Sequence, residues 1–358
     1  MFEPVYSITP LIAKLLMRIS GLKQDIDLAP ITPTMLAHLR ATARMSTIHY
    51  STKIEGNRLT LDQVKELIKK GGSVGRKRDE NEVLGYYAAL DQVDTLAKKK
   101  KITQKDIQHI HAIVMNGGKK RIKQTPYRDG QNVIKDGATG DIVYLPPEAH
   151  DVVQLMQEMV DWINDAPNHD IPVPLIAGIV HYQFVTIHPY YDGNGRTARL
   201  LATLILHQGG YDLKGIYCLE EYYAKDLVSY YRSLTVGPSH NYYMGRAESD
   251  ITSWVEYFCR SMLKSFETVK RRALGNLNRN KDIAKEIRHL DARKRALLTL
   301  FVHESEITAK DVQDFFNIKS RTARHLCKQW VLDEFLVIVN PSKKLRTYAL
   351  ADEYKKLI

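Results

Sequence analysis

Apolar residues recur at helical spacing along most of the chain, and this pattern predicts a mainly α-helical protein. Two strongly apolar runs, residues 174–186 and 196–208, are separated only by a short polar loop. A proline begins the first run, and Gly209-Gly210 end the second. The other segments with helical patterns are residues 11–22, 33–45, 61–70, 82–96, 103–114, 150–164, 221–234 and 251–266.

Residues 127–147 depart from the helical pattern. Two short β-prone runs, Val133-Ile134 and Ile142-Val143-Tyr144, flank the turn-rich sequence KDGATGD, which predicts a β-hairpin with a loose tip. An exposed hairpin edge can add a strand from a partner protein. The alternative is a hairpin with a purely structural role.

The loop between the two apolar runs holds the candidate chemistry of the chain. His188 is a candidate proton acceptor near neutral pH, and Asp192 offers a hard oxygen ligand for Mg²⁺. The sequence Gly193-Asn194-Gly195 brings free backbone N–H groups to the start of the second helix, where phosphate binds readily. These parts together indicate phosphoryl or nucleotidyl chemistry.

Two arginines strengthen this interpretation. Arg196 and Arg199 occupy the first turns of the second helix, where the helix dipole disfavours cations unless an anion is bound. Taken singly, a GNG loop is typical of a plain turn, and a lone histidine is typical of a structural role. Seven specified residues within twelve positions favour the chemical interpretation.

The stretch from His188 to Arg199 resembles the signature of Fic proteins, His-x-Phe-x-(Asp/Glu)-Gly-Asn-Gly-Arg-x-x-Arg. The resemblance implies a helical bundle that transfers AMP from ATP to a protein hydroxyl. One position departs from the signature, because Tyr190 stands where phenylalanine is usual. In the family this side chain is thought to pack inward, so a tyrosine there would need a partner for its hydroxyl group.

A second motif of the family lies far upstream. Residues 51–56, STKIEG, match the inhibitory motif (Ser/Thr)-x-x-x-Glu-(Gly/Asn), which implies that Ser51 and Glu55 belong to an inhibitory helix at about 46–57. The resemblance pairs Glu55 with Arg199, where a carboxylate would take the place of the γ-phosphate. Without the signature, Glu55 would be interpreted as a solvated surface residue.

Other features of the family are weaker in this sequence. The resemblance implies that the hairpin is a flap that holds the target protein over the site. It also implies that Tyr230 and Tyr231 border the adenine of ATP, and aromatic faces suit base stacking in any protein. Two tyrosines of the core are the alternative.

The last segment has a pattern of its own. Helical spacing at residues 293–303, 308–315 and 321–331 precedes β-prone runs at 336–339 and 346–350, and this order resembles a winged helix. From Lys264 to the C-terminus the chain carries 21 lysines and arginines against 12 acidic residues, which indicates an anionic partner, nucleic acid first. Protein binding and a merely soluble basic surface are the alternatives. The candidate DNA contacts are Arg321, Arg324, Lys328, Lys343 and Lys344.

Composition limits the remaining choices. The 358 residues are 44% hydrophobic, which suits a soluble protein of two or three domains. We find neither a signal peptide nor an apolar run that would span a bilayer, and the three cysteines lack metal-ligand spacing, so we expect a cytoplasmic protein without membrane contact. The expected domains are an N-terminal helical region (1–105), a catalytic core (106–270), a connector (271–290) and a winged helix (291–358).

The leading hypothesis is a self-inhibited protein adenylyltransferase that uses ATP and Mg²⁺ and modifies a Tyr, Thr or Ser of an unidentified protein, and also itself. One alternative is removal of AMP from a modified protein at the same site. Another is a DNA-binding regulator whose Fic-like domain senses nucleotide. Related proteins often dimerise, which leaves a homodimer open.

Overall fold

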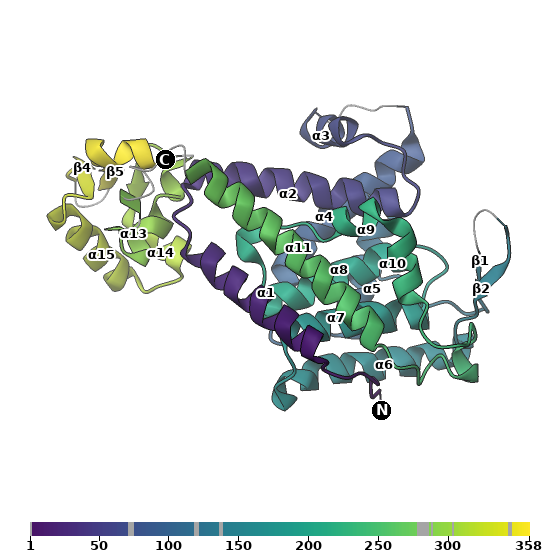
Figure 1. Cartoon of the computed structure of the whole chain (residues 1–358). Helices are drawn as coiled ribbons and strands as arrows, with labels where there is room; N and C mark the ends of the chain where they lie inside the picture. Colours follow the sequence, from purple (N-terminus) through teal and green to yellow (C-terminus); the bar gives the residue numbers. More distant parts are fainter. Residues whose placement is uncertain are drawn as a thin grey trace. The chain divides into compact units, whose positions relative to one another are not determined.

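The computed structural model describes residues 2–70, 75–117, 122–135, 139–277, 286–287, 289–302, 304–342 and 346–358. The prediction of a mainly helical chain with small antiparallel sheets is confirmed (Figure 1). Contacts divide the chain into two units, residues 1–27 with 42–269 and residues 28–41 with 270–358. The predicted domain boundaries stay predictions. The longer helices are α1 (Pro10–Leu28), α2 (Pro33–Ile54), α3 (Leu61–Lys70), α4 (Lys77–Leu96), α5 (Gln104–Met115), α6 (Ala149–Asp165), α7 (Val173–Ile187), α8 (Asn194–Gln208) and α11 (Thr252–Leu277).

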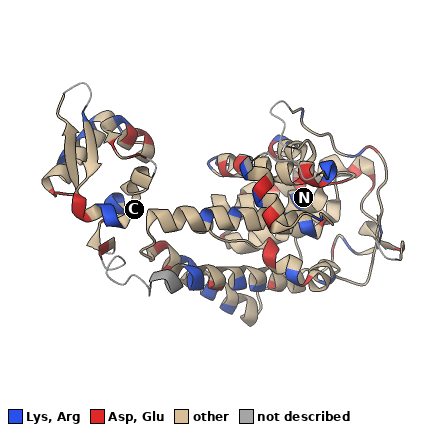
Figure 2. Cartoon of the chain, turned by 90° about the horizontal axis from the view of Figure 1, so that it is seen from above, with Lys and Arg blue, Asp and Glu red and all other residues tan. Residues whose placement is uncertain are grey.

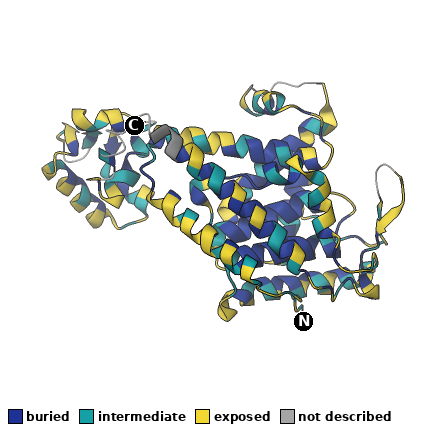
Figure 3. Cartoon of the chain, viewed as in Figure 1, coloured by how far each residue is buried: buried dark blue, intermediate teal, exposed yellow. Residues whose placement is uncertain are grey.

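The core of the larger unit is built around α7 and α8, which pack against each other (Figure 3). Helix α8 also contacts α4 and α5, and α7 contacts α6. Nearly every residue of α7 is buried, which explains its continuous apolar sequence. Gly178 on α7 makes room for Phe258, whose ring atoms lie 3.0 Å from where a Cβ would be, and Trp254 donates a hydrogen bond to the Gly178 carbonyl at 2.7 Å.

The predicted hairpin is present in the larger unit. Strands β1 (Ile134–Lys135) and β2 (Ile142–Tyr144) pair antiparallel, with Ile134 opposite Tyr144 and Lys135 opposite Ile142. Val133 precedes the first strand and is not part of it. The isolated two-stranded form agrees with the sequence, because only short β-prone runs flank the turn.

The smaller unit has a hydrophobic core of its own. Helices α13 (Ala292–Leu297), α14 (Ala309–Phe316) and α15 (Ser320–Leu332) accompany a three-stranded antiparallel sheet. The sheet order is β3 (Ile307–Thr308), β5 (Thr347–Leu350) and β4 (Leu336–Asn340). Residues from all of these elements share one buried cluster, which includes Leu297, Ile307, Val312, Cys327, Trp330, Leu336 and Tyr348.

Several helices differ from their predicted bounds, and two predicted helices are divided differently along the chain. The expected inhibitory helix at 46–57 is the C-terminal half of α2, because no glycine or proline interrupts residues 33–54. The expected helix 221–234 is two helices, α9 (Glu220–Lys225) and α10 (Leu227–Leu234). Asp226 separates them, since its non-helical backbone (φ −136°, ψ 70°) and the hydrogen bond that its side chain accepts from the Ser229 N–H begin a new helix.

Candidate active site

The turn between α7 and α8 places His188 at a strained position. Its backbone is left-handed (φ 50°, ψ 59°), a conformation uncommon for residues other than glycine. The buried Arg128 supports the turn, because its Nε donates to the His188 carbonyl at 3.0 Å and its backbone N–H donates to the Pro189 carbonyl at 2.9 Å. A strained residue held by a buried arginine is typical of a functional site.

The His188 ring is prepared to accept a proton. Its Nδ1 lies 3.2 Å from the Val185 carbonyl, which can only accept a hydrogen bond, so Nδ1 carries the hydrogen and Nε2 has a free lone pair. Burial lowers the pKa of His188 to about 4, and the hydrogen bond to Val185 partly opposes this shift. His188 is therefore a neutral base at pH 7.

The loop after His188 is closed by its own side chains. Asn194 accepts a hydrogen bond from the Tyr190 N–H at 3.0 Å and donates to the Tyr190 carbonyl at 2.7 Å. Asp192 accepts from the Gly193 N–H at 2.6 Å. Gly193 has a positive φ of 77°, which a side chain at this position would oppose. These contacts fix the backbone at the N-terminus of α8.

Arg196 is buried and lies between two carboxylates. Its Nη2 is 3.2 Å from Oδ1 of Asp192, and its Nη1 is 4.0 Å from Oε1 of Glu82. Glu82 also accepts a hydrogen bond at 2.9 Å from Asn57, which follows Glu55 by two residues. The end of the predicted inhibitory segment is therefore connected to Arg196 through Glu82.

Arg199 is also buried, and it binds the predicted inhibitory segment directly. Its Nε donates to the Ser51 hydroxyl at 2.8 Å, and its Nη2 donates to the Ser51 carbonyl at 2.9 Å and to Oε1 of Glu55 at 2.8 Å. Burial alone would lower the pKa of Arg199, but the Glu55 carboxylate and the tyrosines Tyr230 and Tyr86 raise it. The structure thus brings Ser51, Glu55 and Arg199 together, although 144 residues separate the last two.

The Glu55 carboxylate lies over the backbone of Gly195. A Cβ at Gly195 would collide with Oε1 of Glu55 and would lie 3.2 Å from Nη1 of Arg199. Among the described residues this Nη1 has no hydrogen-bond partner. The space above Gly195 is therefore an anion position that Glu55 occupies.

One cavity of about 530 Å³ in the larger unit is lined by Glu55, Gly195 and Arg199. Tyr230 lines it but is buried, and its hydroxyl contacts His181 at 3.0 Å. Tyr231 is 47% exposed and donates to the Ile54 carbonyl at 3.2 Å, so of the two predicted adenine contacts it offers more ring surface. The cavity is also lined by His188, Ile134, Val143 and Tyr144.

The hairpin residues fall into two groups. Ile134, Val143 and Tyr144 line the cavity, and the Tyr144 hydroxyl is anchored on the Thr186 carbonyl at 2.8 Å. Ile142 and Val133 are exposed and do not line it. The hairpin thus borders the cavity and also presents apolar side chains to the solvent.

Tyr190 packs inward, as the family resemblance implies, and its ring stacks on His111 at a centroid distance of 3.5 Å. The expected partner for its hydroxyl is not found among the described residues. A phenylalanine would fit the same position without a buried polar atom, which accounts for the usual residue of the signature.

Asp192 is the residue that would hold Mg²⁺. Its side chain is 59% exposed and carries a negative charge beside the loop N–H groups. Within the described ranges, no group of three or more His, Cys, Asp or Glu residues could hold a metal ion. A single carboxylate fits Mg²⁺, which usually takes one or two carboxylates and completes its coordination with phosphates and water.

No sequence motif marks three of the buried polar residues around the site. His111, Tyr86 and Glu220 lie on α5, α4 and α9. Tyr86 donates to Oε1 of Glu220 at 3.4 Å, and burial raises the pKa of Glu220. Single polar residues on amphipathic helices have no motif around them, so a sequence pattern cannot distinguish them from surface residues.

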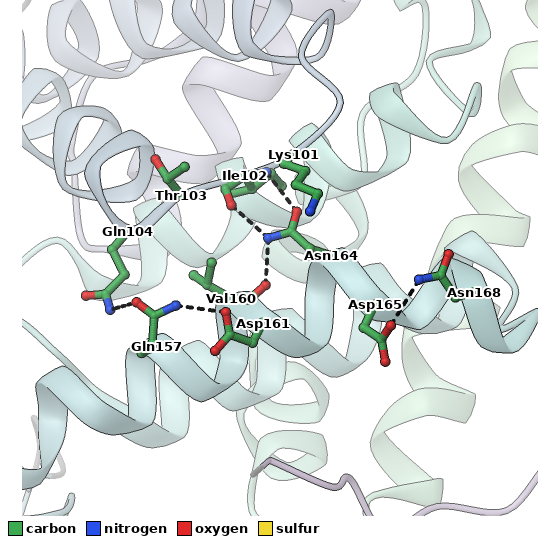
Figure 4. Close-up of a pocket in the computed structure, with 10 residues that line it drawn as sticks. All are labelled: Lys101, Ile102, Thr103, Gln104, Gln157, Val160, Asp161, Asn164, Asp165 and Asn168. Atoms are coloured by element: carbon green, nitrogen blue, oxygen red, sulfur yellow. Dashed lines mark hydrogen bonds between the residues drawn. The ribbon is translucent and has the colours of Figure 1, made fainter.

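A second cavity, of about 460 Å³, lies elsewhere in the larger unit (Figure 4). Its polar side chains bond to one another and to the backbone. Asn164 accepts from the Ile102 N–H at 3.0 Å and donates to the carbonyls of Ile102 and Val160, each at 2.9 Å (Figure 4). This arrangement is typical of a structural junction between α6 and the start of α5.

In the smaller unit, Arg321, Arg324 and Lys328 are exposed on α15, on the side away from the buried Ala323 and Cys327. Figure 2 shows basic and acidic residues interspersed along the ribbon of this unit. Lys343 and Lys344 lie outside the described residues. Among the helices that the structure describes, none is both long and apolar enough to cross a membrane.

Comparison with known proteins agrees with this geometry. Residues 101–206 match the family model described as Fic/DOC family. The chain is 34% identical to the protein adenylyltransferase Fic of Drosophila willistoni over 179 residues, which are 49% of this chain. The chain spans about a third of that relative's length, 34%.

Solved structures show the same fold. A Fic family protein from Desulfovibrio desulfuricans has a TM-score of 0.61 at 24% identity and covers 98% of this chain and 99% of its own. Fic-1 from C. elegans has a TM-score of 0.59 at 25% identity and covers 75% of this chain and 73% of its own.

Proposed function

We propose that the chain is a protein adenylyltransferase that its own Glu55 holds inactive. One observation carries the proposal. The Glu55 carboxylate bonds to the buried guanidinium of Arg199 above Gly195, in the same cavity that His188 lines. Arginine binds carboxylates and phosphates with the same fork of donors, so displacement of Glu55 opens a phosphate position beside a neutral histidine.

The residues in and around the cavity divide the work of the transfer. The N–H groups at the start of α8 and the arginines Arg196 and Arg199 bind the phosphates of ATP. The hydroxyl of a target Tyr, Thr or Ser attacks the α-phosphorus, its proton passes to Nε2 of His188, and the bond to pyrophosphate breaks. Asp192 would hold Mg²⁺, which would supply further neutralisation of the phosphate charge. Alignment and charge stabilisation account for most of the rate.

Relatives named protein adenylyltransferase Fic support this choice of reaction. The hairpin supports the choice of a protein as acceptor, since its exposed Val143 lines the cavity and its exposed Ile142 precedes it on the same strand, where an extended segment of a target can pair. Tyr231 is the better placed of the two tyrosines to stack on adenine, because more of its ring is exposed.

The reaction is tested by incubating the Glu55→Gly variant with ATP labelled on the α-phosphate and, separately, on the γ-phosphate. We expect protein to be labelled from α-labelled ATP alone. Labelling from γ-labelled ATP alone would identify phosphoryl transfer instead, and no labelling of the variant or of a cell lysate would reject the proposal.

One observation supports the reverse reaction. The Glu55 side chain is 27% exposed in the same cavity as His188, so its carboxylate can orient a water molecule toward an AMP-modified hydroxyl. Wild-type protein given a pre-modified target would then release AMP, and Glu55→Gly would not. Absence of AMP release by the wild type would exclude this second function.

We also propose that the smaller unit binds DNA as a winged helix. Helices α14 and α15 with the sheet β3-β5-β4 support this architecture, and the exposed Arg321, Arg324 and Lys328 on α15 support contact with phosphates. The full chain should bind duplex DNA with an affinity that falls as salt rises, and Arg321→Glu with Arg324→Glu should abolish it. Binding that is unaffected by this pair would assign the surface to another role.

A further inference from the structure

His111 touches the loop between α7 and α8 at three positions. It is buried on α5, where 3% of its surface is exposed. Its Nε2 lies 2.9 Å from the Asp192 carbonyl, and its ring lies flat on Tyr190 with an interplanar angle of 11°. It also fills the space beside Gly193, because a Cβ there would be 3.1 Å from Nε2.

The contact with Asp192 has a defined direction. A backbone carbonyl accepts hydrogen bonds only, so Nε2 of His111 is the donor. The stack on Tyr190 fixes the plane of the ring, and the plane fixes the direction of the N–H bond. His111 therefore holds the peptide group that follows Asp192, and this peptide supplies the Gly193 N–H that Asp192 binds.

The carboxylate of Asp192 is otherwise weakly restrained. Its side chain is 59% exposed, and its contacts are the Gly193 N–H at 2.6 Å and Arg196 at 3.2 Å. Its backbone position thus decides where the carboxylate can reach. A partner that orients a metal-binding residue commonly matters as much as one of the metal's own ligands.

We propose that His111 is a positioning residue that orients Asp192 for the Mg²⁺ of bound Mg²⁺–ATP. This inference rests on the proposed function. It assigns to a residue 77 positions upstream of His188 a role that differs from nucleotide binding itself. The hydrogen bond and the stack are separable, because phenylalanine retains the ring and loses the donor, whereas glutamine retains a donor and loses the ring.

The test measures binding by calorimetry in the double variant Glu55→Gly, His188→Ala, which opens the phosphate position and prevents turnover. We expect His111→Phe to weaken binding of Mg²⁺–ATP about 10-fold while binding of ATP in excess EDTA stays unchanged. His111→Gln should restore part of the lost affinity. Tyr190→Phe is the matched control, since it retains the stack and should leave both affinities unchanged.

Each outcome separates the inference from the function it rests on. If the double variant binds no ATP, the proposed function is wrong and the role of His111 with it. If it binds ATP and His111→Phe binds Mg²⁺–ATP as tightly, only the positioning role is wrong. An equal loss of affinity with and without Mg²⁺ also contradicts it, because that result indicates a general structural role.

Discussion

The two cavities of the larger unit differ in how their polar groups are satisfied. In the cavity of Figure 4, Asn164 and Gln157 bond to neighbouring backbone and side chains. In the cavity of His188, a buried guanidinium nitrogen of Arg199 has no partner among the described residues, and a carboxylate lies where an anion would bind. Size does not separate them, since their volumes are similar. A strained histidine and incompletely satisfied charges mark the cavity of His188 as the site of chemistry.

The largest effect is expected on the rate of AMP transfer when His188 is replaced. In the Glu55→Gly background, His188→Ala should lower the rate of AMP transfer about 100- to 10,000-fold, because the hydroxyl proton loses its acceptor. The rate is measured from α-labelled ATP. Gln157→Ala in the other cavity is the control and should leave the rate unchanged. A rate for His188→Ala near that of Glu55→Gly alone would remove His188 from the mechanism.

A smaller effect is expected at Arg199. Arg199→Lys in the same background retains the charge but loses the fork of donors, so the KM for ATP should rise about 10-fold. The KM is measured at saturating target protein, and the affinity for ADP serves as the control, since ADP has no γ-phosphate. An equal loss of affinity for ADP would show that Arg199 does not bind the terminal phosphate.

A substitution in the cavity of Figure 4 should change the stability of the protein and not its activity. Asn164→Ala removes three hydrogen bonds to backbone groups and should lower the free energy of unfolding by about 1–3 kcal/mol. AMP transfer by folded protein should stay unchanged. Urea unfolding and a rate measured at low temperature separate the two quantities, and a selective loss of activity would give this cavity a function.

The smallest effect concerns pH. Burial lowers the pKa of His188 from 6.5 to about 4, so the ring remains a neutral base as pH falls until it approaches that value. Titration of His188 should therefore leave the kcat/KM of Glu55→Gly nearly constant from pH 7.5 to 5.5. A histidine with an unshifted pKa would lose activity about 10-fold by pH 5.5, and this decline is the contradicting result.

The comparison also shows what the sequence could predict. The signature from His188 to Arg199 is contiguous, so its position at the α7–α8 turn followed from two apolar runs and a polar loop. The link between Glu55 and Arg199 came from the family resemblance, because nothing in the residues between them indicates that they meet. His111 could not be predicted, since it acts through one backbone carbonyl of the loop and any helix residue can make such a contact.

Some of the predicted helix bounds were wrong for a similar reason. A single residue, Asp226, divides α9 from α10, and its capping role depends on the Ser229 N–H, which the apolar spacing of 221–234 does not reveal. Conversely, α2 continues through Ser46 because polar residues alone do not end a helix. Local hydrogen bonds therefore decided the bounds, and apolar spacing decided which helices exist.

The central claim is that Glu55 closes a transferase site, and the most direct test compares the initial rates of AMP incorporation by wild type and Glu55→Gly. Loss of the charged hydrogen bond to Arg199 should raise the rate about 10- to 100-fold. Glu55→Gln, which retains the size of the side chain without its charge, should lie between them. Equal rates for wild type and Glu55→Gly, with both proteins folded and ATP bound, would contradict the account.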